Sequence, residues 1–217
     1  MIGRAVTIAR VANLPAQKSI IAWCTAFALV LVWSFIDAKD RYTWWLEVLP
    51  ALIAVVILAA TMRRFPLTAL VYWLIFVHAV VLMIGGHYTY AEVPLFEWLE
   101  APLGWERNNY DKVGHFVQGF VPALIARELL IRLTPLERGA WLNYLVVSVC
   151  LAISAFYELI EWWVALMSQQ AADSFLGTQG YVWDTQSDMA WALFGAVCCV
   201  TLLGRWHDRQ LAALGYM

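Results

Sequence analysis

Residues 67–86, LTALVYWLIFVHAVVLMIGG, contain no Asp, Glu, Lys or Arg. An α-helix of this length spans about 30 Å, which matches the hydrocarbon core of a bilayer. Similar apolar runs recur along the chain, in which 63% of the 217 residues are hydrophobic and only 14% are charged. The composition therefore predicts an all-α, polytopic membrane helix bundle and excludes an ordinary soluble domain.

Six such segments predict about six transmembrane helices in one integral membrane domain that covers residues 1–217. We place them near residues 19–36, 44–62, 67–86, 113–133, 141–167 and 187–204. An uncleaved first span is favoured over a signal peptide, whose apolar region is usually shorter. Residues 94–100, PLFEWLE, mix bulky apolar and acidic side chains, which favours a short interfacial segment over a plain surface loop.

Positive charges predict the orientation of these spans. With six spans, nine Lys and Arg residues fall on the side of the two termini and four fall on the other side. The positive-inside rule then predicts that both termini face the cytoplasm. The bilayer is the expected partner, and nucleic acid is excluded because no cluster of Lys and Arg interleaved with aromatic residues occurs.

Residues 108–116, NNYDKVGHF, are a dense polar run immediately before the fourth predicted span. If a helix begins near Asp111, then Asp111 and His115 share one of its faces. Two further acidic pairs have helical spacing, in the fifth span and at the start of the sixth. In the predicted orientation all these side chains, and His87, lie at the outer face. The candidate catalytic residues are Asp111, His115, Glu158, Glu161, Asp184 and Asp188.

Each of these residues also has a purely structural interpretation. Glu158 and Glu161 precede two tryptophans and would then be interfacial, whereas Asp184 and Asp188 would stabilise a helix N-terminus. His78 has no polar companion in its own span, so we expect it to be a packed core residue. Arg127 and Glu128, which we place nearer the inner end, predict ion pairs within or between helices.

A divalent metal ion is one explanation for the polar residues. One histidine with several carboxylates suits Mg²⁺, Mn²⁺ or Zn²⁺, with Asp111, His115, Glu158, Glu161 and Asp188 as the hypothetical ligands. Without a metal, crowded carboxylates would raise one another's pKa, and one of them would become a general acid.

Three blocks, residues 108–118, 157–163 and 175–196, resemble the bacterial inner-membrane YjdF family. More remotely, DKVGHF at residues 111–116 resembles the D-K-x-x-H-F signature of VanZ-like membrane proteins. The chain departs from the VanZ-like pattern near Asp188, where the usual preceding Arg and following Asn are absent. The resemblance implies an inner-membrane location, a similar architecture and an association with the cell envelope, but no particular reaction.

Three functions fit these observations. The first is a membrane-embedded enzyme that acts on a lipid or cell-envelope substrate at the outer leaflet. The second is a small transporter or proton-coupled permease in which the acidic residues form a relay. The chain has no internal repeat, so a homo-oligomer would have to supply the symmetry common in transporters. The third is a structural membrane protein whose polar residues only lock the helices together.

Overall fold

The computed structural model describes residues 17–167 and 179–216, and every regular element in these residues is a helix. The all-α, polytopic fold expected from the sequence is confirmed. The helices are α1 (Gln17–Phe35), α2 (Arg41–Thr61), α3 (Ala69–Tyr88), α4 (Pro94–Leu103), α5 (Tyr110–Leu133), α6 (Ala140–Met167) and α8 (Asp184–Ala213).

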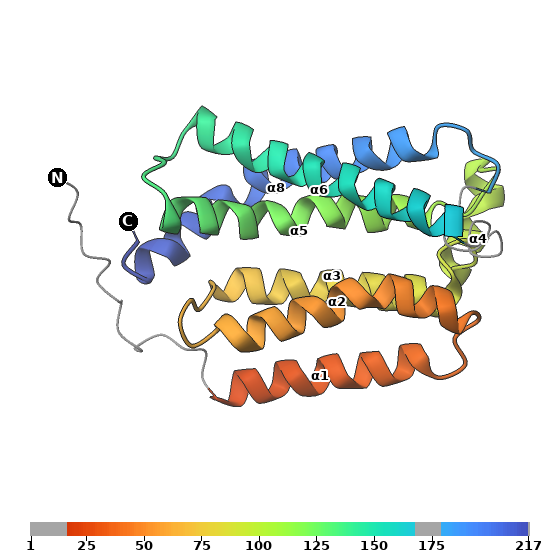
Figure 1. Cartoon of the computed structure of the whole chain (residues 1–217), viewed down its shortest axis with the longest axis horizontal. Coiled ribbons are helices and arrows are strands. Elements are labelled where there is room, and N and C mark those ends of the chain that lie inside the picture. Colours follow the sequence, from red (N-terminus) through yellow and green to blue (C-terminus); the bar gives the residue numbers. More distant parts are fainter. Residues whose placement is uncertain (1–16, 168–178, 217) are drawn as a thin grey trace.

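The long helices run side by side in two groups (Figure 1). Helices α1, α2 and α3 form one group, and α5, α6 and α8 form the other, with α3 packed against α5. The short helix α4 lies at the end of the bundle where α5 and α8 begin, whereas α8 ends at the opposite end. The fold therefore brings the N-terminal turns of α5 and α8 and the C-terminal half of α6 to the same end.

Five helices, α1, α2, α3, α6 and α8, are long and apolar enough to cross a membrane among the described residues. They coincide with five of the predicted spans. The remaining predicted span, 113–133, lies in α5, which is 24 residues long but carries Asp111, Lys112 and three further charged residues, Arg127, Glu128 and Arg132. Its charged side chains are mostly buried against α3 and α8, so α5 is shielded by protein. The number of spans and their orientation stay predictions.

Two apolar clusters fill the bundle. The larger one joins α3, α5, α6 and α8 through residues such as Val71, Leu124, Val146 and Cys199, all with 0% exposure. The smaller one joins α1, α2 and α3. Burial of a large aliphatic side chain contributes about 1.5–3 kcal/mol in water, whereas in a bilayer such contacts act mainly through close packing.

Helices α5 and α8 approach each other at two glycines. A Cβ atom at Gly119 on α5 would overlap the carbonyl oxygen of Ala192, and one at Gly195 on α8 would overlap the carbonyl oxygen of Phe116. Small residues at such positions let two helix backbones make direct contact. This crossing fixes the position of Asp188, two turns before Gly195, relative to His115, one turn before Gly119.

A fully buried polar network holds the other end of this helix pair. Glu128 has 0% exposure and accepts hydrogen bonds from the backbone and hydroxyl of Thr68. It also pairs with Arg132 at 2.6 Å and with His207 at 3.0 Å. Every one of these partners is a side chain or backbone group of α3, α5, α8 or the turn before α3. The network therefore ties three helices together without leaving its carboxylate unpaired.

The predicted ion pairs of Arg127 and Glu128 are confirmed. Arg127 pairs with Asp208 of α8 at 2.6 Å, and Glu128 pairs with Arg132 one turn further along α5. These contacts explain why α8 continues to Ala213, well beyond the predicted end of the span at residue 204. The charged residues after Gly204 belong to the helix because α5 supplies their partners.

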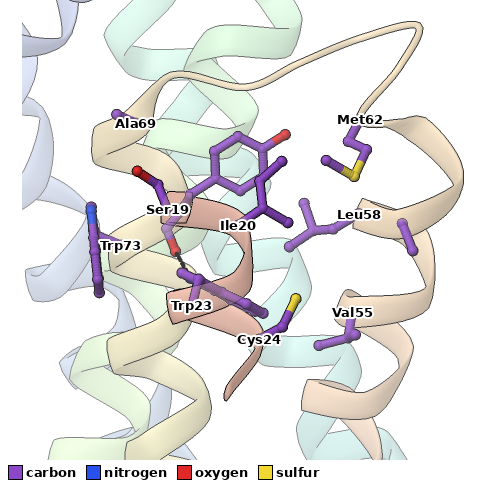
Figure 2. Close-up of a pocket in the computed structure, with 11 residues that line it drawn as sticks. Ser19, Ile20, Trp23, Cys24, Val55, Leu58, Met62, Ala69 and Trp73 are labelled. Atoms are coloured by element: carbon purple, nitrogen blue, oxygen red, sulfur yellow. Dashed lines mark hydrogen bonds between the residues drawn. The ribbon is translucent and has the colours of Figure 1, made fainter. Parts of the chain in front are cut away.

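An apolar cavity of about 290 Å³ lies between α1, α2 and α3, at the end away from α4 (Figure 2). Trp23, Leu58 and Trp73 are among its lining residues, and the indole of Trp23 donates a hydrogen bond to the carbonyl oxygen of Tyr72. The cavity contains none of the candidate catalytic residues.

Candidate functional site

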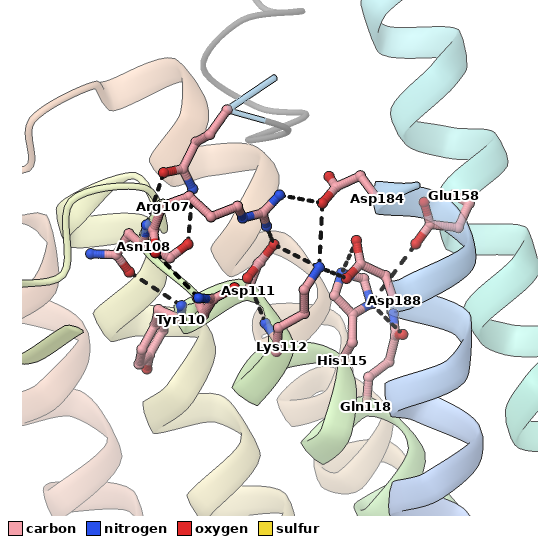
Figure 3. Close-up of polar contacts among 12 residues, drawn as sticks. Arg107, Asn108, Tyr110, Asp111, Lys112, His115, Gln118, Glu158, Asp184 and Asp188 are labelled. Carbon is pink, nitrogen blue, oxygen red and sulfur yellow. Dashed lines mark hydrogen bonds and ion pairs between the residues drawn. The ribbon is translucent and has the colours of Figure 1, made fainter. Parts of the chain in front are cut away.

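Five of the six candidate residues come together where α5 and α8 begin and α6 approaches its end (Figure 3), and the sixth, Glu161, lines the adjoining cavity together with three of them. All six are at least nine-tenths buried: Asp111, His115, Glu158, Glu161, Asp184 and Asp188. Their buried positions make them unlike acidic residues on a solvated helix face. Whether they have a catalytic role stays a prediction.

Two cations neutralise the three aspartates of this group. The ammonium of Lys112 lies 3.4 Å from Asp111, 3.3 Å from Asp184 and 2.9 Å from Asp188. The guanidinium of Arg107 pairs with Asp111 and, at 2.6 Å, with Asp184. Partly buried pairs of this kind are stable only when each charge has close partners. Lys112 and Arg107 therefore hold the start of α5 against the start of α8.

His115 lies between two carboxylates from different helices. Its Nε2 is 3.6 Å from Oδ2 of Asp188, and its Nδ1 is 3.9 Å from Oε1 of Glu158. Nδ1 is also 3.2 Å from Oε1 of Gln118, one turn further along α5. If Nδ1 carries the proton, it donates to Gln118 and leaves the lone pair of Nε2 directed towards Asp188.

Glu158 is only partly satisfied by its neighbours. Its Oε1 is buried and has no hydrogen-bond partner in the described part of the chain. A buried carboxylate oxygen without a donor is costly, so such an atom calls for a ligand or another specific explanation.

Two sets of side chains have the spacing of metal ligands. His115, Glu158 and Asp188 each offer one ligand atom, and these atoms lie within 4.8 Å of one another. Asp111, Asp184 and Asp188 form the other set, but Lys112 already lies between them. Glu161 belongs to neither set within the described residues. The first set therefore fits a metal ion better than the second.

A cavity of about 170 Å³ adjoins His115 and Asp188 and extends towards α2 and α3. It is also lined by residues that were not among the candidates, namely Glu47, His78, Tyr90 and Tyr157, together with the candidate Glu161. The hydroxyl of Tyr157 donates to Glu47 at 3.4 Å and so links α6 to α2. Carboxyl groups thus gather from α2, α5, α6 and α8 around one space.

Hydrogen bonds connect the segment before α5 with the segment before α8. Asn108 is 1% exposed, and its side-chain amide donates to the carbonyl oxygen of Val93 at 3.0 Å. Its backbone exchanges two hydrogen bonds with the side chain of Gln179, at 3.0 and 2.9 Å. These bonds fix the loop that carries Arg107 over the site.

Sequence reasoning missed several of these residues. Glu47 is an acidic residue inside a predicted span, which is a signal for function that could have been used. Lys112 lies inside the polar run, but at the sequence level it contributed only to the count of positive charges that predicts the membrane orientation. His78 lines the cavity although its own span offers it no polar companion, because its neighbours come from α2 and α6. His87 contacts Ser34 and Trp33 instead of the site.

Comparison with known proteins agrees with this architecture. A sequence model of the family described as "Predicted membrane protein (DUF2238)" matches residues 20–209. The chain is 55% identical over 187 residues to the inner membrane protein YjdF of Escherichia coli strain K12, which covers 86% of this chain and 90% of that protein. No solved structure matches the chain.

Proposed function

This chain belongs to the DUF2238 family of predicted membrane proteins, and we propose that it is an enzyme with a divalent metal ion in its polar site. It is a multi-pass protein of the inner membrane. The substrate class that we propose is a lipid or another amphiphile of the cell envelope, because the site lies at one end of a membrane-embedded helix bundle.

One observation carries the proposal. Three buried ligand atoms, from His115, Glu158 and Asp188, lie within 4.8 Å of one another, and one of them has no hydrogen-bond partner among the described residues. Two ligands about 2.1 Å from a tetrahedral ion lie about 3.4 Å apart. The separation of 3.6 Å between Nε2 of His115 and Oδ2 of Asp188 is close to this value. Gln118 supports the arrangement because a metal-ligating histidine usually donates its other N–H to a neighbouring group.

The ion would polarise an ester or phosphoryl oxygen and provide a nucleophilic water at neutral pH. The residues of the chain have separate tasks in this scheme. His115, Glu158 and Asp188 hold the ion, and Lys112 fixes the orientation of Asp188 from the side away from His115. Arg107 and Lys112 keep Asp111 and Asp184 paired.

A comparison of the two buried polar networks argues against a purely structural role. At the other end of α5, Glu128 is paired with Arg132, His207 and Thr68. A network that only locks helices is expected to look like this one, because unpaired buried charges are costly. Both networks contain a buried polar atom without a hydrogen-bond partner among the described residues, Nε of Arg132 and Oε1 of Glu158, but only the atom of Glu158 is a carboxylate oxygen that could bind a cation.

A transmembrane proton relay is also disfavoured. Gln118 and Glu128 are about 15 Å apart along α5, given the helical rise per residue. Between these levels the bundle contains apolar residues with no exposure, such as Leu124, Val146 and Cys199. A relay needs closely spaced groups that carry protons, and these fully buried apolar side chains supply none.

Metal analysis of the purified protein tests the proposal. The wild type, His115→Ala, Glu158→Gln and the surface control Glu92→Gln are loaded with Zn²⁺ or Mn²⁺, desalted and analysed by mass spectrometry. We expect about one bound ion in the wild type and the control, and at least about tenfold weaker retention in the two site variants. Size-exclusion profiles and helical circular dichroism show that the variants are folded. Equal metal content in all four folded proteins would contradict the proposed metal site.

A further inference from the structure

The part of the cavity formed by α2 and α6 holds a second pair of carboxyl groups. Glu47 of α2 is 6% exposed and Glu161 of α6 is 7% exposed, and both line the cavity that reaches His115. Neither belongs to a set of three metal-ligand atoms in the described residues. This pair therefore needs an explanation separate from the metal site.

The partners of these two carboxyl groups are few. Glu47 accepts a hydrogen bond from Tyr157, and Tyr90 is a further hydrogen-bond partner of the same group. Glu161 has no hydrogen-bond or ion-pair partner within residues 17–167 and 179–216, although it is more than nine-tenths buried. No Lys or Arg is among the described residues that line the cavity. The cavity lining therefore offers carboxyl groups and phenols but no ammonium or guanidinium group.

We propose that Glu47, Glu161, Tyr90 and Tyr157 bind a primary ammonium group in the head group of the substrate. This proposal rests on the proposed function, because it treats the cavity beside the metal ligands as the substrate site. The ammonium group has three N–H donors and no acceptor, which suits two carboxylates and the oxygen atoms of two phenols. Charge-assisted hydrogen bonds of this kind are about twice as strong as neutral ones.

The tyrosines make an organic cation more suitable than a bare ion. Tyr90 lies in the turn after α3, and burial raises the pKa of its hydroxyl well above the usual value, so the phenol stays neutral. A neutral phenol can donate to Glu47 while its ring contacts a cation. A quaternary ammonium group would leave the carboxylates without donors, and so a primary amine is the better match.

The size of the cavity limits what can enter. Its volume of about 170 Å³ is below the range of about 300–1,000 Å³ that is typical of pockets for whole drug-sized ligands. It can accept a small head group while the acyl chains stay in the bilayer. An ethanolamine head group has the right parts, since its phosphate would face the metal ligands and its ammonium the two glutamates.

Binding of soluble short-chain lipids tests this assignment. Calorimetry on the purified protein compares dihexanoyl lipids with ethanolamine, choline and glycerol head groups, for the wild type, Glu47→Gln, Glu161→Gln and the exposed control Glu97→Gln. We expect the wild type and the control to bind the ethanolamine lipid about tenfold more tightly than the other two. Both cavity variants should lose this preference. Because the readout is a ratio within each protein, a smaller folded fraction does not affect it.

Equal affinities for the three lipids, or an unchanged preference in both cavity variants, would overturn the ammonium subsite. Metal content and head-group preference are separate readouts, so a failure of the metal proposal can be distinguished from a failure of the ammonium subsite. His115→Ala should lose metal and keep the preference for ethanolamine, whereas Glu161→Gln should keep metal and lose the preference. A wild type that selects ethanolamine without holding metal would leave the subsite supported and only the metal centre refuted.

Discussion

Nε2 of His115 lies 3.6 Å from Oδ2 of Asp188, although the two residues come from different helices, α5 and α8. The helix crossing at Gly119 and Gly195 makes this possible, since each glycine accepts the backbone of the other helix. The site is therefore built on two rigid elements in direct backbone contact. Such sites hold their ligands more precisely than sites on loops.

The glycine crossing gives a first prediction. Gly119→Ala and Gly195→Ala should each destabilise the protein by about 1–3 kcal/mol or more, because the added methyl group has to displace backbone atoms. Gly204→Ala on α8 is the matched control, since a Cβ atom there meets nothing within 4 Å. It should be neutral or stabilising by about 0.5–1 kcal/mol. Thermal unfolding in detergent measures all three, and equal melting temperatures would contradict the crossing.

Lys112 gives a second prediction. Replacing it by Ala leaves Asp111, Asp184 and Asp188 with only the charge of Arg107, so the protein should lose about 3 kcal/mol of stability in the presence of a chelator. The three aspartates have ligand spacing, so millimolar Ca²⁺ should restore much of the lost stability in the variant. Lys39→Ala, at an exposed lysine, should respond to neither change. If Ca²⁺ does not raise the melting temperature of the Lys112→Ala protein, the three aspartates do not form a cation-binding position that the Lys112 ammonium fills in the wild type.

The network around Glu128 gives a third prediction. Glu128→Ala should destabilise the protein by about 3–5 kcal/mol, because it leaves Arg132 and His207 buried without their shared anion. The exposed Glu137→Ala serves as the control and should be nearly neutral. Since this network is remote from the cavity, any Glu128→Ala protein that stays folded should keep its metal affinity. Thermal unfolding and metal titration on the same preparations separate the two effects.

The membrane orientation gives a fourth prediction. The distribution of positive charges predicts that both termini face the cytoplasm, and hence that α4 and the polar site lie outside. In a background without the four native cysteines, Glu97→Cys on α4 should react with an impermeant maleimide added to intact cells. Arg64→Cys, in the turn between α2 and α3, should react only after the cells are opened. The reverse pattern would invert the orientation and move the site to the cytoplasmic side.

Much of the helix layout follows from composition and periodicity. The apolar runs located five helices that are long and apolar enough to cross a membrane, and the spacing of Asp111 with His115 and of Glu158 with Glu161 predicted which side chains share a helix face. The end of α8 was missed because Arg205 and Asp208 look like a polar tail. They stay helical because α5 supplies partners for them, which is information from tertiary structure.

The cavity was harder to foresee than the polar group beside it. Glu47 approaches Tyr157 because α2 packs near α6, and no local pattern in either segment encodes that contact. The position of Lys112 among three aspartates likewise depends on the crossing of α5 and α8. Sequence spacing identifies which residues share a helix face, whereas packing decides which faces meet.

Imidazole ligation of a metal ion by His115 is the central claim, and pulsed electron paramagnetic resonance of the Mn²⁺-loaded protein tests it most directly. Nitrogen-14 modulation from a coordinated imidazole should be present in the wild type and in His78→Ala, whose histidine lines the same cavity without belonging to the ligand set. The modulation should disappear in His115→Ala. Modulation that survives in His115→Ala, or that is absent from the fully loaded wild type, would contradict the metal site.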